Sequence, residues 1–227
     1  METRLSQRLT AVAAYVPQNA RLLDIGSDHA YLPIYLVEQN RIHFAIAGEV
    51  VKGPYQSALS NVSSSALSDK IDVRLANGLA AFEAEDMIDT ITICGMGGRL
   101  IAEILENGRA KLHSVQRLIL QPNNREDDLR LWLAQNDFKI VDEEIMTEND
   151  KYYEIIIAEH GKKTLSVADL RFGPLLKQEK SNVFVSRWRN ELVKLETAFT
   201  KIPEVNTSDR SAISQKIQAI KEVLNEN

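Results

Sequence analysis

The sequence has a single cysteine, Cys94, among its 227 residues. One thiol excludes an intrachain disulfide and any zinc site built from several cysteines. The four histidines do not follow the spacing of metal ligands, so we expect no bound metal. No apolar run approaches the ~20 residues that cross a bilayer, and the first stretch, METRLSQRLTAVAAYV, lacks the continuous apolar region of a secretion signal. We therefore expect a cytoplasmic protein that is not bound to a membrane.

Basic residues are fewer than acidic ones, 27 against 32, and they are unevenly distributed. The net charge is −5, yet residues 161–227 carry 12 Lys and Arg against 8 Asp and Glu, whereas residues 1–160 carry 15 against 24. A basic tail on an acidic body suggests a polyanionic partner. Surface helices are often lysine-rich for solubility alone, and charge counting by itself favours that simpler explanation.

Hydrophobic periodicity predicts strands alternating with helices as far as residue 160. We predict helices at 3–16, 32–39, 55–67, 100–106 and 126–135, with one short helical turn at 79–82, and strands at 22–25, 44–50, 71–75, 90–93, 117–120, 138–143 and 153–158. Helices between the first five strands require parallel pairing with right-handed crossovers. The last two strands lack an intervening helix and should pair antiparallel. This is the outline of a Rossmann-like α/β domain, although other doubly wound folds share the pattern.

Beyond residue 160 the strand pattern stops. Apolar residues recur every three or four positions over 185–199 and again over 213–224. Two such stripes joined by a short turn predict an antiparallel coiled-coil hairpin, with Thr207 or Ser208 as the cap of the last helix. We therefore expect two domains, 1–160 and 161–227. A single long helix packed back on the sheet remains an alternative.

The most informative motif is RLLDIGSDHAYLP at 21–33, which reads as strand, glycine turn and helix. α/β proteins use this unit to bind nucleotide-like ligands. A dinucleotide fingerprint needs three glycines, but only Gly26 is present, and Asp28 stands where the second would be. A carboxylate there would repel a phosphate and could face a cation. The motif therefore favours a positively charged nucleoside, S-adenosyl-L-methionine, over NAD.

Other strand ends supply further candidates for this ligand. Asp24 could order the glycine turn and receive an ammonium group, or it could simply accept backbone hydrogen bonds. Glu49 ends the second strand, where an acidic side chain can accept both ribose hydroxyls. Asn77 and Gly78 could offer polar groups to an adenine edge, but Asn-Gly is equally a common tight turn.

A second glycine-rich turn, CGMGG at 94–98, follows the fourth strand. Its backbone could approach a flat ring closely. No Lys-Ser/Thr pair follows, which excludes a phosphate-binding P-loop. Cys94 is expected to pack as a small apolar residue rather than act as a nucleophile. His29 could touch the substrate or serve as a structural hydrogen-bond partner.

The segments LLDIGSDHAYLP, AGEVVKGPYQSA, ANGL, ICGMGG, LILQPN and KYYEIII resemble the bacterial tRNA (adenine-22-N1) methyltransferase family. The likeness covers most of the first 160 residues, and the basic tail is also similar. Cys94 departs from the alanine that relatives often carry. The resemblance implies a class I methyltransferase fold, S-adenosyl-L-methionine as donor, and N1 of adenine 22 in the tRNA D-arm as acceptor.

The resemblance also implies roles for individual residues. The donor would be bound by Asp24, Gly26, Ser27, Asp28, Glu49, Val50, Asn77, Gly78, Gly95 and Met96. The target base would meet Asp28, His29, Tyr31 and Asn123, with Met96 also on that side. Asp28 would either favour the developing positive charge on the methylated adenine or serve only the donor. Tyr31 would stack on a base extruded from the RNA, or else pack on the sheet.

If the substrate is tRNA, the basic tail can contact its phosphates. Its candidate phosphate contacts are Lys177, Lys180, Arg187, Arg189, Lys194 and Lys201. Two alternatives remain: a small-molecule methyltransferase whose hairpin dimerises, and a non-enzymatic module whose coiled coil recruits a partner. We expect a monomer or a weak homodimer.

Overall fold

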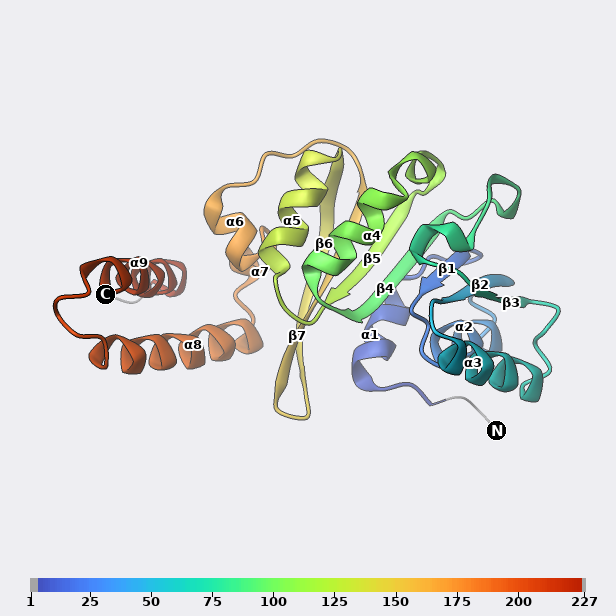
Figure 1. The fold of residues 1–227 in the computed structure, drawn as a ribbon, viewed down its shortest axis with the longest axis horizontal. Helices are drawn as coiled ribbons and strands as arrows, with labels where there is room; N and C mark the ends of the chain where they lie inside the picture. The colour runs from blue at the N-terminus through green and yellow to red at the C-terminus, as the bar shows by residue number, and fades with distance from the viewer. Residues whose placement is uncertain (1–3, 226–227) are drawn as a thin grey trace.

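The computed structural model describes residues 4–225 and contains one central sheet (Figure 1). Its strands are β1 (Arg21–Ile25), β2 (Phe44–Glu49), β3 (Ile71–Leu75), β4 (Thr90–Met96), β5 (Arg117–Pro122), β6 (Phe138–Glu148) and β7 (Lys151–His160). They lie in the order β3-β2-β1-β4-β5-β7-β6. The first five are parallel, whereas β7 runs antiparallel to β5 and β6 antiparallel to β7. The predicted doubly wound α/β sheet with an edge hairpin is confirmed.

Helices cover both faces of the sheet. One face packs against α1 (Gln7–Tyr15), α2 (Tyr31–Glu38) and α3 (Lys52–Ser64), and the other against α4 (Gly98–Asn107) and α5 (Glu126–Gln135). Leu22 belongs to the first core and Leu23 to the second, because successive side chains of a strand point to opposite faces. Short 3₁₀ turns occupy Gly78–Ala81, Ala84–Asp86 and Arg109–Ser114.

Several boundaries differ from the predicted ones. The first helix begins at Gln7, after Ser6 accepts a hydrogen bond from the Leu9 amide; residue 3, where we predicted its start, lies outside the described residues. β4 continues to Met96 instead of ending at residue 93. β6 and β7 extend to a two-residue turn, Asn149-Asp150, in which both residues have positive φ. That conformation matches the twist of the paired strands, so the ladder continues to the tip.

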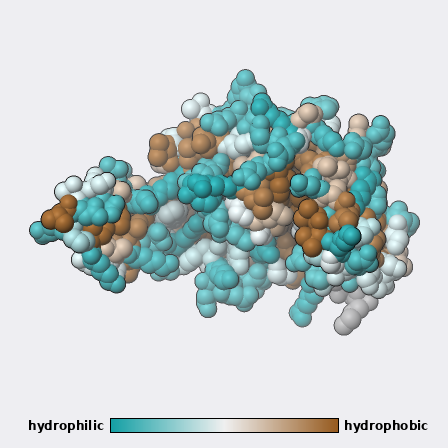
Figure 2. Space-filling model, viewed as in Figure 1, coloured by the Kyte–Doolittle hydropathy of each residue, from teal (hydrophilic) through white to brown (hydrophobic). Residues whose placement is uncertain are grey.

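After the sheet the chain forms α6 (Val167–Phe172), α7 (Leu176–Glu179), α8 (Asn182–Thr200) and α9 (Thr207–Leu224). The α8–α9 pair projects from the sheet domain (Figure 1), and on the face in Figure 2 its surface is largely hydrophilic. The alternative of one long helix on the sheet is wrong. The helical hairpin is present, while its coiled-coil geometry stays a prediction.

A third apolar core joins this tail to the sheet domain. Ile145 of β6 packs with residues from α6 to α9: Phe172, Leu176, Phe184, Trp188, Leu192 and Ile220. α6 and α7 therefore share a core with the sheet, and the boundary near residue 161 stays a prediction. The predicted cap of the last helix is wrong: Asn206, not Thr207 or Ser208, accepts from the Asp209 amide. Across the described residues, no helix has the length and apolarity needed to cross a membrane.

Candidate active site

Asp24 lies at the centre of the candidate site, near the end of β1. Its carboxylate accepts hydrogen bonds from the hydroxyls of Ser27 and Thr92, each at 2.6 Å, and so ties the first turn to β4. The residue is only 4% exposed. Burial raises the pKa of Asp24 to about 6, against the lowering effect of these two hydroxyls. A buried carboxylate with a raised pKa at a strand end is suited to a cationic ligand.

Gly26 brings the two glycine-rich turns together. Its φ is +65°, and a Cβ built there would lie 2.2 Å from Cε of Met96. Its amide donates to the Gly48 carbonyl at 2.9 Å, which ties the turn to β2 as well. The turn after β1 is thus in direct contact with Met96 at the carboxyl end of β4, so the two glycine-rich segments predicted from the sequence lie side by side.

The turn that follows is strained. Asp28, His29 and Ala30 have φ values of 40°, 69° and 59°. Such conformations cost on the order of 1–3 kcal/mol each. They persist because Glu49 accepts from the Asp28 amide at 2.6 Å and Asn61 donates to the His29 carbonyl at 3.0 Å. The surrounding structure therefore imposes this backbone path.

The strained path gathers three predicted residues on the surface. The Asp28 side chain is 84% exposed, and its Oδ1 lies 3.5 Å from Nε2 of His29. The ring of His29 stacks on Tyr31 with a centroid distance of 5.3 Å. Tyr31 is 42% exposed, so it does not pack inside the sheet domain. Together they offer a carboxylate acceptor, from Asp28, and two aromatic rings at the turn after β1.

Glu49, at the end of β2, is 5% exposed, and burial raises the pKa of its carboxyl. Its Oε1 accepts a hydrogen bond from the Asp28 amide. Val50, which follows, is 64% exposed. Beside them, Asn77 is exposed and Gly78 is buried, at the start of the 3₁₀ turn after β3. All four lie at the carboxyl ends of neighbouring strands, where α/β sheets bind ligands.

The second turn is held by an amide network that sequence reasoning missed. Gln121, fully buried at the end of β5, accepts from the Gly95 amide at 3.0 Å and donates to Oδ1 of Asn123 at 3.2 Å. Asn123 in turn donates to the Gly95 carbonyl at 2.7 Å. Gly98 is required here because a Cβ would lie 2.2 Å from the Arg125 carbonyl oxygen. The network fixes the exposed Asn123 against the turn after β4.

Arg8 is a further residue that the sequence did not single out. From α1 it donates to the Gln121 side chain and lies over the ring of Tyr153, 5.4 Å from its centroid. Its Nη1 would be 3.7 Å from a Cβ at Gly95. A half-buried guanidinium thus borders the second turn. The sequence shows only the helical spacing of apolar residues in α1. No local pattern indicates that Arg8 contacts Gln121, which is distant in the chain.

The predicted RNA-contacting cations are not equivalent. Lys194 and Lys201 are exposed. Lys177 pairs with Asp169 at 3.1 Å. Arg187 is bound to Glu126 and Glu154. The remaining two, Lys180 and Arg189, are half-buried and exposed, respectively.

A groove of about 1300 Å³ separates α5 and the β6–β7 hairpin from the C-terminal helices. Its lining includes Asn123 from the candidate site, Tyr152 and Tyr153 from β7, and Lys194 from α8. Figure 2 shows apolar side chains gathered over α6, whose Val167 also lines the groove and is 83% exposed. The groove thus links the candidate site to the projecting helices.

Two kinds of chemistry receive no support. Burial raises the pKa of the Cys94 thiol strongly, so it is not a thiolate near neutral pH. Among residues 4–225, no cluster of three or more His, Cys, Asp or Glu is arranged to hold a metal ion. The side chains at the two turns instead fit a cationic nucleoside: two buried carboxylates, Asp24 and Glu49, beside a turn closed to bulky residues at Gly26.

Comparisons with known proteins identify the family of the chain. The family profile described as tRNA (adenine(22)-N(1))-methyltransferase matches residues 22–222. The chain is 40% identical to the tRNA (adenine(22)-N(1))-methyltransferase of Bacillus subtilis, over 98% of each protein.

Solved structures are similar over almost their whole length. A putative tRNA (m1A22) methyltransferase of Streptococcus pneumoniae, in complex with S-adenosyl-L-methionine, has a TM-score of 0.92 and 58% identity, covering 97% of this chain and 100% of that one. The M. capricolum TrmK structure, in complex with S-adenosyl-homocysteine, has a TM-score of 0.87 and 33% identity, covering 97% and 98%. These matches show that the chain belongs to the tRNA (adenine(22)-N(1))-methyltransferase family.

Proposed function

We propose that this protein transfers the methyl group of S-adenosyl-L-methionine to N1 of adenine 22 in tRNA. The observation that carries the proposal is the contact between the turn after β1 and the carboxyl end of β4, where a Cβ on Gly26 would meet Met96. Family membership favours an RNA substrate over the small-molecule alternative and favours an enzyme over a binding module. The reaction needs donor and base side by side, and adjacent turns supply that arrangement.

The donor residues lie along the carboxyl ends of β1 to β4. Asp24 and Glu49 supply the buried negative charge for a cationic nucleoside, and the amides of Gly26 and Ser27 donate to the Gly48 carbonyl, which tethers the turn to β2. Val50, Asn77 and Gly78 border the expected adenine side, and Gly95 with Met96 closes the opposite side. When bound, S-adenosyl-L-methionine supplies an electrophilic methyl group on its sulfonium.

The target base requires orientation rather than a strong general base, because adenine N1 already carries an in-plane lone pair. Asn123 is held by Gln121 and Gly95 and keeps one amide hydrogen available for the base edge. The stacked rings of His29 and Tyr31 offer a surface for an extruded base. Asp28, largely exposed beside them, would favour the positive charge that methylation leaves on adenine.

The body of the protein is acidic, so we assign the phosphate contacts to the C-terminal helices. The exposed Lys194 and Lys201 are the strongest candidates, together with Lys180 and Arg189. Lys177 and Arg187 are half-buried beside carboxylates, so we rank them below the exposed cations as RNA contacts. The groove between α5 and α8 would guide the RNA toward Asn123. We also propose that the protein is cytoplasmic and that it is a monomer or a weak homodimer.

Methyl transfer from labelled S-adenosyl-L-methionine to unmodified tRNA transcripts tests the proposal. We expect incorporation into a transcript with adenine at position 22, background incorporation into the matched transcript with guanine there, and negligible reaction with free adenosine. Equal labelling of the two transcripts would show that the target nucleotide is wrong. Labelling of adenosine as fast as tRNA would restore the small-molecule alternative.

A further inference from the structure

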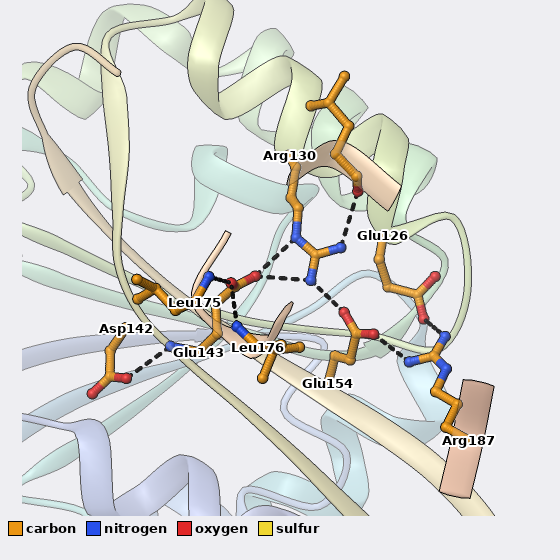
Figure 3. Close-up of polar contacts among 9 residues, drawn as sticks. Glu126, Arg130, Asp142, Glu143, Glu154, Leu175, Leu176 and Arg187 are labelled. Atoms are coloured by element: carbon orange, nitrogen blue, oxygen red, sulfur yellow. Dashed lines mark hydrogen bonds and ion pairs between the residues drawn. The ribbon is translucent and has the colours of Figure 1, made fainter. Parts of the chain in front are cut away.

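Five charged side chains form a cluster between the sheet domain and the C-terminal helices (Figure 3). We call Glu126, Arg130, Glu143, Glu154 and Arg187 the buried charge cluster. Arg130 of α5 is fully buried and lies 2.8 Å from Oε1 of Glu143 on β6. It also pairs with Glu154 on β7, whose side chain is fully buried as well. Buried charges of this kind persist only when they are paired and hydrogen-bonded.

The same cluster holds the chain that leads into the tail. Arg130 donates to the carbonyl of Leu170 in α6 at 3.1 Å. Glu143 accepts from the amide of Leu175, next to α7, at 2.9 Å. Figure 3 shows these groups converging on the Arg130 guanidinium and the Glu143 carboxylate. The path from β7 to α8 is therefore fixed by contacts to charged groups of the sheet domain.

Arg187 extends the cluster to α8. Its Nη1 meets Glu154, and its Nη2 lies 2.9 Å from Oε1 of Glu126. Burial lowers the pKa of Arg187, but Glu154 and Glu126 raise it more, so the net pKa is above the ordinary value. Glu126 is the first residue of α5, three positions after Asn123. One side chain thus spans the distance from α8 to the segment that carries Asn123.

We infer that Arg187 is a positioning residue, which fixes the angle of the RNA-contacting helices relative to the target-base turn. The inference rests on the proposed function. Asn123, Arg187 and Lys194 line the same groove, so the orientation of α8 sets where RNA held by Lys194 meets Asn123. A guanidinium fork can engage two carboxylates at once, which an ammonium group does poorly.

Charge counting within the cluster gives the consequence of losing Arg187. The cluster holds three carboxylates and two guanidinium groups. Without Arg187, Glu126 of α5 loses its ion pair with α8, and Glu154 of β7 keeps only its pair with Arg130. α8 then loses its ion-pair link to α5 and β7, so the apolar core around Ile145 alone sets its angle, while the exposed phosphate-contacting lysines are unchanged. RNA would still bind, but the base would be delivered to the site less often.

Arg187→Met tests the inference, with Lys194→Met as the matched loss of one cation on the same helix. We expect Arg187→Met to lower the single-turnover methylation rate at saturating tRNA at least 10-fold and to change the tRNA Kd less than 3-fold. Lys194→Met should do the reverse, weakening tRNA binding with little change in the saturated rate. Hydrogen exchange provides a readout without turnover: only Arg187→Met should expose the amides of residues 123–130.

Glu126→Gln is the second variant, because it keeps the Arg187–Glu154 pair and removes only the negative charge of the link between Arg187 and α5. It should lower the saturated rate in the same direction, and adding it to Arg187→Met should lower the rate no further. If Arg187→Met weakens tRNA binding with an unchanged saturated rate, Arg187 is a phosphate contact and the inference is wrong. The inference is also wrong if the saturated methylation rate and the hydrogen exchange of residues 123–130 are unchanged in both Arg187→Met and Glu126→Gln. A wild-type protein that binds tRNA without methylating it would instead refute the proposed function.

Discussion

The ionised form of Asp24 should destabilise the protein when no cofactor is bound, and Asp24→Asn should relieve this cost. Burial raises the pKa of Asp24 from its ordinary 3.8 to about 6. That rise corresponds to about 3 kcal/mol of unfolding free energy at pH values above both. Between pH 4 and 6 the folded protein binds more protons than the unfolded chain, so stability falls as the pH rises through this window.

The Asp24→Asn substitution would keep the shape of the side chain without the charge. Ser27 and Thr92 can rotate their hydroxyls to donate or accept, so both remain satisfied. At pH 7.5 the variant should therefore unfold about 6–12 °C above the wild type, given about 2–4 °C per kcal/mol for a chain of this size. The same substitution should weaken S-adenosyl-L-methionine binding, because it removes the negative charge of Asp24 that we assign to the cationic cofactor. A functional site can keep such a charge although it lowers the stability of the fold.

Thermal unfolding without cofactor, followed from pH 4.5 to 8, measures this difference. We expect the advantage of Asp24→Asn to be largest above pH 7 and to shrink toward pH 4.5. Asp28→Asn is the matched control: its carboxylate is 84% exposed, so its effect on unfolding should stay within about 0.5 kcal/mol. An advantage that does not vary with pH, or a variant less stable than wild type at pH 8, would refute the reasoning.

Three further predictions concern the site and the tail. Gly26→Ala places a Cβ against Met96 at a φ of +65°; it should cost about 1–2 kcal/mol of stability and weaken cofactor binding at least 10-fold, as calorimetry would show, and intact affinity would contradict the role of this turn. Asn123→Ala should lower the methylation rate at least 10-fold with unchanged cofactor affinity; a change in cofactor affinity alone would place Asn123 in the donor pocket instead. Lys194→Met should reduce the salt dependence of tRNA binding by about one phosphate contact, and an unchanged slope would remove Lys194 from the RNA surface.

The order of elements could be predicted because each depends on local patterns. Alternating strands and helices dictate parallel pairing, and the turn at Gly26 is visible as a single glycine after an apolar strand. The short helix α6 has a local signal that we did not use, the capping pair Ser166 and Asp169. The cap at Asn206 was also within reach, since Asn is as strong a capping residue as Ser.

The contacts that hold the site together could not be predicted in this way. Arg130 looks like an ordinary helix cation, and its burial depends on Glu143 and Glu154, which arrive from later strands. Arg187 was grouped with the tail cations for the same reason. Arg8 reaches Gln121 across 113 positions of the chain. Such pairs form between residues that are distant in the sequence and meet only when the chain packs. Local sequence patterns therefore do not reveal them.

The central claim is that the turn after β1 and the turn after β4 line one ligand site. Hydrogen exchange on the full-length protein, with and without S-adenosyl-homocysteine, tests it most directly. We expect residues 24–30 and 94–98 to gain protection together and at the same ligand concentration. Protection of only one of these segments, or saturation at clearly different concentrations, would contradict the claim.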